Sequence, residues 1–280
     1  LAERHAQPIF LFVHTVDPHA PFAPPESLRA RLAPAADPAR GTMAYLARLA
    51  AKELPVDAAT VADLHALYGA EVAFADAELG ELLAALRRAG RYDDALIVFL
   101  SDHGEAFHEH GVLGHGWDLY QEVLRIPLIL KLPGRRHAGR RVARPVAQID
   151  VAPTLLAAAG LAGGELPGAG LLAPSAAGER LHVAYLRYAG REGISVSDGR
   201  FKLILPLSSS FAAGAELYDL DRDPAERHNR LFDHPVRAAY LEAAARRALG
   251  ARRDGAAPVT LSDEERTRLE ALGYLGGDAR

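Results

Sequence analysis

This sequence of 280 residues contains no cysteine. That absence excludes disulfide bonds, thiolate metal ligands and a cysteine nucleophile within these residues. The sequence also lacks the uninterrupted run of roughly 18 apolar residues that a membrane-spanning helix needs. The formal net charge is −4 and no basic cluster is present, so the footprint of a nucleic-acid-binding protein is missing. What remains is a globular chain that is long enough to bury a sizeable core.

The sequence begins without an initiator methionine and without a signal peptide. Its first eight residues lead directly into the strand-like apolar segment 9–13. We therefore expect these 280 residues to be a portion of a larger protein.

The stretch 95–105, with the sequence ALIVFLSDHGE, combines a predicted buried strand with chemically capable side chains. In open α/β sheets, ligands bind just beyond the carboxyl ends of the strands. Asp102 and His103 follow the apolar residues there and could offer an oxygen and a nitrogen to one cation. The competing interpretation is an ordinary turn, with Asp102 as a cap and Gly104 at positive φ. The stretch predicts half of a metal site.

The apolar segment 9–13 also predicts a buried strand, and it is followed by Asp17 and His19. Prolines at positions 18, 21, 24 and 25 exclude a helix or a strand ladder and predict a stiff, extended loop. On such a loop His19 is either a solvated side chain or a ligand-binding side chain held in one direction.

Hydrophobic periodicity predicts the architecture of the first half. Apolar residues spaced by three and four over residues 61–88 predict one long helix that ends at Gly90. A helix followed by the buried strand at 96–100 is half of a parallel α/β unit. Residues 126–132 predict another strand, and residues 148–159 predict a helix. We expect residues 26–62 to be a surface excursion.

The character of the sequence changes after the Gly-, Ala- and Pro-rich segment 161–180, which predicts a boundary. Residues 201–205 and 216–218 predict antiparallel strands, and residues 233–250 predict a helix. Ser262 and Glu265 have the spacing of a capping box and predict a last helix. These elements favour a small α+β appendage.

Together these segments form a collinear series that covers nearly the whole sequence. The motifs are FLFVHTVDPHAPFAPP, LYGAEVAFADAELGELLAALRRAGRYDDALIVFLSDHGE, the GHG element with LYQEVLRIPLIL, IDVAPTLLAAAGL, ELYDLDRDPAERHNRL and LSDEERTRLEALGYLGG. In this order they resemble the sulfatase family of the alkaline phosphatase superfamily.

The resemblance implies an α/β fold with a mostly parallel sheet flanked by helices. Residues 1–165 would be the C-terminal part of the catalytic domain, and residues 166–280 a smaller α+β subdomain. It also implies that Asp102 and His103 bind a metal ion, and that His19 and His115 contact the substrate and take part in catalysis. The implied reaction is metal-assisted hydrolysis of a sulfate monoester, which needs charge neutralisation and a proton for the departing alkoxide.

The sequence departs from the family at the nucleophile. It contains neither a C-x-P-S-R nor an S-x-P-S-R motif, whose Cys or Ser is converted to formylglycine, and the family's early acidic metal-binding pair is also missing. We therefore expect the C-terminal portion of a sulfatase-like enzyme, with formylglycine in a missing N-terminal segment. This portion alone is expected to be inactive.

The resemblance implies one divalent cation, with calcium expected and magnesium, manganese or zinc left open. Asp17 is followed at the fourth position by Pro21, where two-metal superfamily members carry His, which argues for a single metal. Secretion or a periplasmic location is an expectation from the family, and no oligomeric state is indicated.

Several alternatives stay open. The same scaffold could hydrolyse a phosphate or phosphonate ester or transfer a phosphoryl group, or it could be a catalytically inactive, truncated sulfatase domain. The His- and Gly-rich loop after Gly104 also allows a self-sufficient zinc hydrolase. Its candidate ligands are His103, His108, His110 and His115.

Overall fold

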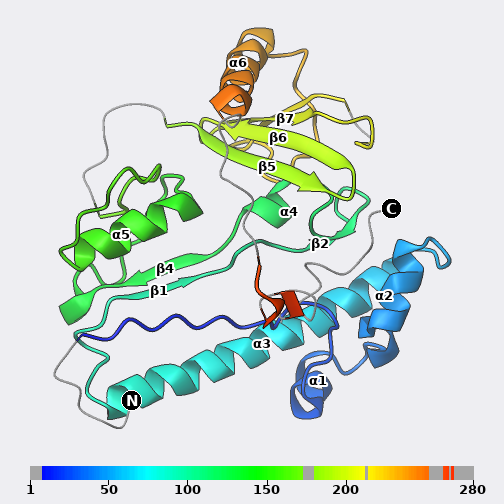
Figure 1. Cartoon of the computed structure of the whole chain (residues 1–280). Coiled ribbons are helices and arrows are strands. Elements are labelled where there is room, and N and C mark those ends of the chain that lie inside the picture. The colour runs from blue at the N-terminus through cyan, green and yellow to red at the C-terminus, as the bar shows by residue number, and fades with distance from the viewer. Residues whose placement is uncertain (1–7, 173–179, 212–213, 252–260, 265, 268–280) are drawn as a thin grey trace. The chain divides into compact units, whose positions relative to one another are not determined.

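The computed structural model of the chain (Figure 1) describes residues 8–172, 180–211, 214–251, 261–264 and 266–267. The chain divides into two compact units. The first unit comprises Leu1–Ile97, Ala106–Leu113 and Leu130–Ala138, and the second comprises Val98–Glu105, Gly114–Ile129 and Gly139–Arg280.

The described elements are helices, gathered mainly in the first 90 residues, and short strands, four of which follow one another between residues 182 and 219. The helices are α1 (Glu26–Leu32), η1 (Pro38–Gly41), α2 (Met43–Ala50), α3 (Ala58–Arg88), α4 (Gln121–Leu124), η2 (Pro133–Arg135), η3 (Gln148–Asp150), α5 (Val151–Ala158) and α6 (Pro235–Ala251). The strands are β1 (Ile97–Leu100), β2 (Ala106–Phe107), β3 (Leu113–Gly114), β4 (Leu128–Lys131), β5 (His182–Tyr188), β6 (Arg191–Ser197), β7 (Phe201–Pro206) and β8 (Glu216–Asp219).

The first unit is organised around α3, which confirms the predicted long helix. The Asp57 side chain caps its start by accepting a hydrogen bond from the Thr60 backbone N–H at 2.7 Å. Gly90, at φ +65°, follows its end. The buried face of α3 packs into one apolar cluster. Its buried members are Phe22, Ala33, Ala36, Leu49, Leu64, Leu67, Ala70 and Phe107.

Residues 26–50 are not the surface excursion that the sequence predicted. They fold into α1, η1 and α2, and both α1 and η1 pack against α3. Ala33, Ala36 and Leu49 are buried in the cluster. The alanines that made this segment look uninformative are small enough to let it lie close to α3.

The predicted buried strand at residues 9–13 is wrong for the described part of the chain. These residues form no strand, and Phe10 and Phe12 are 78% and 77% exposed. A strand needs a neighbour for its backbone hydrogen bonds, and no described segment pairs with residues 9–13.

The strand before Asp102 is confirmed as β1, and the strand predicted at 126–132 is confirmed as β4. They pair with each other in a two-stranded sheet, and β2 pairs with β3. The burial predicted for β1 is only partial, since Phe99 is 40% exposed. The predicted mostly parallel sheet is not resolved among the described residues, because residues 9–13 add no strand to β1 and β4.

The second unit contains a four-stranded antiparallel sheet in the order β5-β6-β7-β8. The strands predicted at 201–205 and 216–218 are confirmed as β7 and β8, and their antiparallel pairing is confirmed. Strands β5 and β6 were not predicted from the sequence. The helix predicted at 233–250 is confirmed as α6.

Both faces of this sheet are covered. On one face Ile194, Val196 and Leu203 pack against Leu241 of α6, as Figure 1 shows for the orange helix beside the sheet. On the other face, Ile204 and its neighbours pack against residues 119–124, the segment that contains α4. The sheet therefore supports the segment that follows His115.

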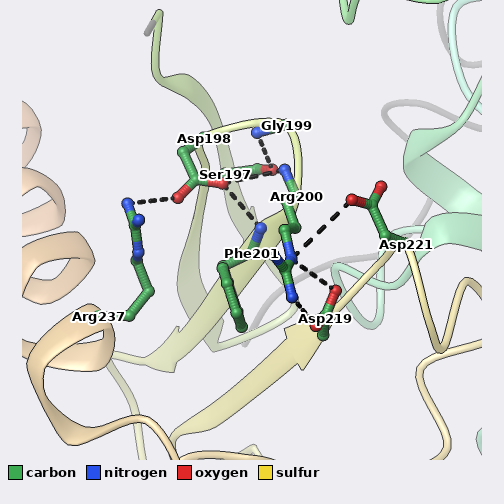
Figure 2. A network of polar contacts seen from close by, with 8 residues as sticks. All are labelled: Ser197, Asp198, Gly199, Arg200, Phe201, Asp219, Asp221 and Arg237. Atoms are coloured by element: carbon green, nitrogen blue, oxygen red, sulfur yellow. Dashed lines mark hydrogen bonds and ion pairs between the residues drawn. The ribbon is translucent and has the colours of Figure 1, made fainter.

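A polar network closes the β6–β7 turn (Figure 2). Asp198 Oδ1 accepts the backbone N–H groups of Arg200 and Phe201 at 2.9 and 2.7 Å. Asp198 Oδ2 accepts a hydrogen bond from Arg237 of α6 at 2.8 Å, and Arg200 binds Asp219 of β8. One turn thus ties α6 and β8 to the same end of the sheet.

The remaining predicted helices have different outcomes. The helix at 148–159 is confirmed as η3 and α5, followed by Gly160 at φ +71°. For the last helix, the Arg266 N–H donates to Ser262 O at 2.9 Å. The predicted capping partner Glu265 and the residues from 268 onward lie outside the described residues.

Candidate functional site

The candidate metal-binding residues lie in a turn directly after β1. The Ser101 hydroxyl donates to His103 O at 2.7 Å, and the His103 N–H donates to Asp102 Oδ1 at 2.9 Å. The Gln148 side-chain amide donates to Ser101 O at 3.2 Å and also to Asp102 O. These hydrogen bonds hold the turn from both sides.

Position 104 needs glycine because there is no room for a Cβ atom, and not because its φ is positive. Its N–H donates to Val123 O at 2.8 Å, and a Cβ at this position would lie 2.0 Å from Glu122 O. Gly104 is absent from the residues with positive φ. The close approach fixes the Asp-His turn on α4.

The Asp102 and His103 side chains meet at their ends. Asp102 Oδ2 lies 3.7 Å from His103 Nε2, and the side chains are 62% and 28% exposed. Two ligands about 2.1 to 2.4 Å from one cation lie roughly 3 to 3.7 Å apart when they sit at neighbouring coordination positions. The separation therefore fits two ligands of one cation.

The hydrogen bond of His103 also favours a role for this residue as a metal ligand. Its Nδ1 lies 2.9 Å from Gly104 O, which can only accept, so Nδ1 carries the proton in this contact. In the neutral ring the lone pair is then on Nε2, the atom that faces Asp102. A backbone carbonyl that fixes the tautomer in this way is a common partner of metal-binding histidines.

His115 lies beside this pair. The rings of His103 and His115 stack with centroids 3.9 Å apart and planes inclined by 29°. His115 Nδ1 lies 3.0 Å from Glu105 Oε2, and the Glu105 side chain is only 10% exposed. The structure thus brings Asp102, His103 and His115 together and adds Glu105, whose carboxylate is the partner of His115 Nδ1.

The segment that follows His115 is held by the C-terminal sheet. The Tyr120 hydroxyl donates to Glu216 Oε2 at 2.7 Å, and the Gln121 N–H donates to Glu226 Oε2 at 2.6 Å. Glu226 is 1% exposed and forms an ion pair of 2.8 Å with Lys202, which is also buried. Burial lowers the pKa of Lys202 and raises the pKa of Glu226.

His19 lies in the first unit, on the loop that prolines were predicted to stiffen. Its Nδ1 lies 2.8 Å from Ala20 O, an arrangement like that of His103. The loop is fixed by Phe22, whose N–H donates to Gly41 O at 2.9 Å, and by Ala23, whose N–H donates to Glu71 Oε1 at 2.7 Å. Glu71 on α3 is 3% exposed.

Glu71 and Gln148 were not predicted to support the site, and Glu105 was expected only to cap the turn or to support a ligand. Glu71 stands inside a quoted motif and Gln148 directly precedes another, but a polar residue in a helix carries no sign of its distant partner. Glu105 follows the DHG element directly, and only the fold shows that His115 is its partner.

Other metal arrangements find no support in the described part of the chain. There, no group of three or more His, Asp or Glu side chains is placed to hold a metal ion. This argues against a zinc site built from His103, His108, His110 and His115, all of which are described. Among the described helices, none combines the length and apolar character needed to cross a membrane.

Solved structures that superpose on this chain define the class of its fold. The phosphonate monoester hydrolase of Agrobacterium radiobacter superposes with a TM-score of 0.58 and 26% identity, over 75% of this chain and 46% of that one. Solved sulfatases superpose in the same way. The fold is that of the alkaline phosphatase superfamily.

The sulfatase family profile matches residues 1–161, more than half of the chain, so the chain belongs to the sulfatase family. The profile "N-sulphoglucosamine sulphohydrolase, C-terminal" matches residues 108–250. Sulfatases are hydrolases that typically use a divalent metal ion.

Two curated relatives show the extent of the similarity. The uncharacterized sulfatase YidJ of Escherichia coli (strain K12) is 35% identical over 179 residues, which are 60% of this chain and 34% of YidJ. Choline-sulfatase of Rhizobium meliloti (strain 1021) is 30% identical over 176 residues, 60% of this chain and 33% of that enzyme. The chain spans about a third of the length of these relatives.

Proposed function

We propose that this chain is the C-terminal portion of a sulfuric ester hydrolase. In this proposal residues 1–165 contribute to a catalytic α/β domain with a mostly parallel sheet, and residues 166–280 form a smaller subdomain. The observation that carries the proposal is the pair formed by Asp102 Oδ2 and His103 Nε2, 3.7 Å apart at the end of β1.

Asp102 and His103 would hold one divalent cation. Asp102 supplies an anionic oxygen, and His103 supplies Nε2 because Gly104 O fixes its other nitrogen. A cation bound there would act as a Lewis acid toward the ester oxygens. The Asp102 carboxylate is the kind of oxygen ligand that calcium, the proposed ion, and magnesium prefer, and the His103 imidazole keeps manganese or zinc open. Further ligands must come from other groups.

His115 and His19 would contact the ester. Glu105 accepts from His115 Nδ1, so Nε2 is the His115 atom that would meet a sulfate oxygen or the leaving oxygen. The same carboxylate stabilises the imidazolium that protonates a departing alkoxide. His19, fixed through Ala20 O, would be a second donor to the anion. The nucleophile, expected to be formylglycine, would come from residues outside this sequence.

A second candidate is hydrolysis of a phosphate or phosphonate ester. It is favoured by the similarity of the fold to a phosphonate monoester hydrolase. Both reactions need the same charge neutralisation of non-bridging oxygens, so the Asp-His pair and His115 would serve either.

The test uses the natural protein that contains these residues, with 4-nitrophenyl sulfate and 4-nitrophenyl phosphate as substrates. Asp102→Asn should abolish turnover and weaken calcium binding measured by calorimetry. Asp94→Asn is the matched control, because Asp94 is an exposed residue before the same strand.

Dominant sulfate hydrolysis that disappears in Asp102→Asn supports the proposal. Dominant phosphate hydrolysis favours the second candidate. Unchanged activity and calcium binding in Asp102→Asn would contradict the metal role, and turnover of neither ester would favour an inactive domain. Robust turnover by the 280 residues alone would contradict the expected external nucleophile.

A further inference from the structure

Helix α4 lies between the Asp-His turn and the C-terminal sheet, and it is only four residues long. A helix of this length has too few internal hydrogen bonds to form on its own, so other parts of the chain must fix it. Its Val123 O accepts the Gly104 N–H at 2.8 Å. Gly104 O is in turn the partner of His103 Nδ1. A contact that fixes α4 therefore also fixes the direction of the His103 ring.

The start of α4 has no cap from its own sequence. Within the described residues, Tyr120 at the N-cap position makes no capping hydrogen bond with its side chain, unlike the Ser, Thr, Asp or Asn that helices prefer there. The Gln121 N–H, one of the donors that a helix start leaves without an internal partner, donates to Glu226 Oε2 at 2.6 Å. Glu226 lies 105 residues further along the chain and is 1% exposed. A buried, distant carboxylate thus caps α4.

The backbone of Glu226 has an unfavourable conformation for a glutamate. Its φ of +54° lies in the left-handed region, which glycine adopts freely and a residue with a Cβ seldom adopts. A glutamate at such a position indicates that its side chain is needed there. The second carboxylate oxygen, Oε1, lies 2.8 Å from Lys202 Nζ. The two oxygens of Glu226 therefore have separate partners, one on β7 and one on α4.

Lys202 holds the Glu226 carboxylate from the sheet. It lies on β7, between β6 and β8, and is buried. Burial lowers the pKa of Lys202, and the charges of Glu226, Glu122 and Asp118 oppose this lowering. Glu122 belongs to α4 and Asp118 lies shortly before it, so the ammonium group attracts the α4 segment as well as Glu226. Lys202 thus joins the rigid sheet to the helix that holds the Asp-His turn.

We propose that Glu226 is a positioning residue for the metal-binding turn: held by Lys202, it caps α4, and α4 fixes Gly104 and thereby the His103 ring. The inference rests on the proposed function, because it takes Asp102 and His103 as ligands of one cation. The contacts form a continuous series, whose members in order are Lys202, Glu226, Gln121 and Val123 of α4, Gly104 and His103. Removing a group that orients a metal ligand typically weakens metal binding about 10- to 100-fold.

The first experiment removes only the N–H that Glu226 accepts. Gln121→Pro replaces it by a ring carbon, and proline is favoured at the first position of a helix. Tyr120, with φ −79° and ψ 168°, already has the extended conformation that a residue before proline prefers. In the natural protein that contains this chain, freed of metal by a chelator, Gln121→Pro should raise the calcium Kd measured by calorimetry about tenfold or more. Gln121→Ala is the matched control. It keeps the N–H and should stay within about twofold of the wild type.

The second experiment changes the acceptor in two double variants that both remove the buried charges. Lys202→Met with Glu226→Gln keeps a side-chain oxygen for the Gln121 N–H and should raise the calcium Kd less than about threefold. Lys202→Met with Glu226→Met has no acceptor there and should raise it about tenfold or more. The calcium concentration for half-maximal hydrolysis of 4-nitrophenyl sulfate should rise by the same factors, with the KM for the ester nearly unchanged. All titrations are made well below the thermal midpoint of each variant.

Calcium affinity separates positioning from mere stabilisation of the fold, because a residue that only stabilises the fold lowers the thermal midpoint and leaves the affinity of the folded protein unchanged. Equal calcium affinity in Gln121→Pro and Gln121→Ala, or in the two double variants, overturns the proposal. Asp102→Asn separates it from the proposed function. If that variant binds calcium as tightly as the wild type, the proposed metal site fails and the positioning role fails with it. If it loses calcium while Gln121→Pro retains wild-type affinity, only the positioning role fails.

Discussion

Residues 9–13 and strand β7 are similar in sequence and opposite in environment. Both are short and rich in β-branched, aromatic and leucine residues, yet Phe12 is 77% exposed and Leu203 is 1% exposed. Strand β7 has β6 and β8 on either side, each joined to it by a local connection. Residues 9–13 have no paired strand among the described residues. An apolar pattern shows that a segment can form a strand. The segment forms one only where a neighbouring strand supplies partners for its backbone hydrogen bonds.

The largest expected effect on stability comes from removing a charged side chain that is buried in the sheet of the second unit. Lys202→Met leaves the buried Glu226 carboxylate without its partner, and we expect a loss of about 3 to 5 kcal/mol in the free energy of unfolding. Urea denaturation measures this loss.

Lys52→Met is the control, since Lys52 is exposed and should change stability by less than about 0.5 kcal/mol. Lys202→Met combined with Glu226→Gln should recover part of the stability, because a neutral side chain at 226 can still accept from Gln121. A loss no larger than that of the control would show that the ion pair is not buried.

The comparison itself is tested by truncating one apolar side chain in each segment. Leu203→Ala should cost about 2 to 5 kcal/mol, because it opens a cavity in the core between the sheet and α6. Phe12→Ala should change stability by less than about 0.5 kcal/mol, because most of the Phe12 side chain is already in water. Thermal and urea unfolding of both variants measure the difference; similar losses would mean that Phe12 is covered in solution.

A smaller effect is expected where the Asp-His turn approaches α4. Gly104→Ala should cost about 1 to 3 kcal/mol, because its Cβ would fall 2.0 Å from Glu122 O. Gly80→Ala on α3 is the control. A Cβ at position 80 meets nothing within 4 Å, so this change should stabilise by about 0.5 to 1 kcal/mol. Equal stability of the two variants would exclude the close contact at Gly104.

The smallest expected effect is a pH dependence in the first unit. Burial raises the pKa of Glu71, the Ala23 N–H opposes this rise, and Asp17 adds to it. A carboxyl with a raised pKa in the folded state contributes stability below its unfolded pKa, near 4.5, and this contribution is lost as the pH rises through the folded pKa.

The urea midpoint should therefore fall less between pH 5 and pH 8 in Glu71→Gln than in the wild type. Glu78→Gln, an exposed change on the same helix, should keep the wild-type dependence. A Glu71→Gln profile parallel to the wild type would contradict the raised pKa.

The sequence predicted the elements that carry local signals. Helix α3 has its capping aspartate, its period of three and four residues and its terminal glycine within one stretch, and β7 and β8 follow turn residues. Strands β5 and β6 were missed because Arg, Glu, Gly and Ser interrupt their apolar pattern, and their pairing supplies what their composition does not. Residues 26–50 were missed because alanines bury well only against a partner such as α3.

The candidate site likewise contains residues that the sequence predicted and supporting residues that it did not. Asp102, His103, His19 and His115 were found because they follow apolar segments or stand in motifs, although their catalytic roles stay predictions. The supporting contacts of Glu105, Gln148 and Glu71 join residues far apart in the sequence or without a local signal. They follow from the fold alone.

The hydrogen bond from the Gln121 N–H to Glu226 joins residues 105 positions apart. A ribosome adds about 5 to 20 residues per second, so roughly 5 to 20 seconds separate the synthesis of these two residues. Throughout that interval the segment carrying His115 exists without the acceptor that holds its helix, and until β8 is complete at Asp219 it also lacks the full four-stranded sheet. The Asp-His turn is thus made early and fixed late, so a nascent chain that stops before residue 226 carries all the predicted ligands without the support that positions them.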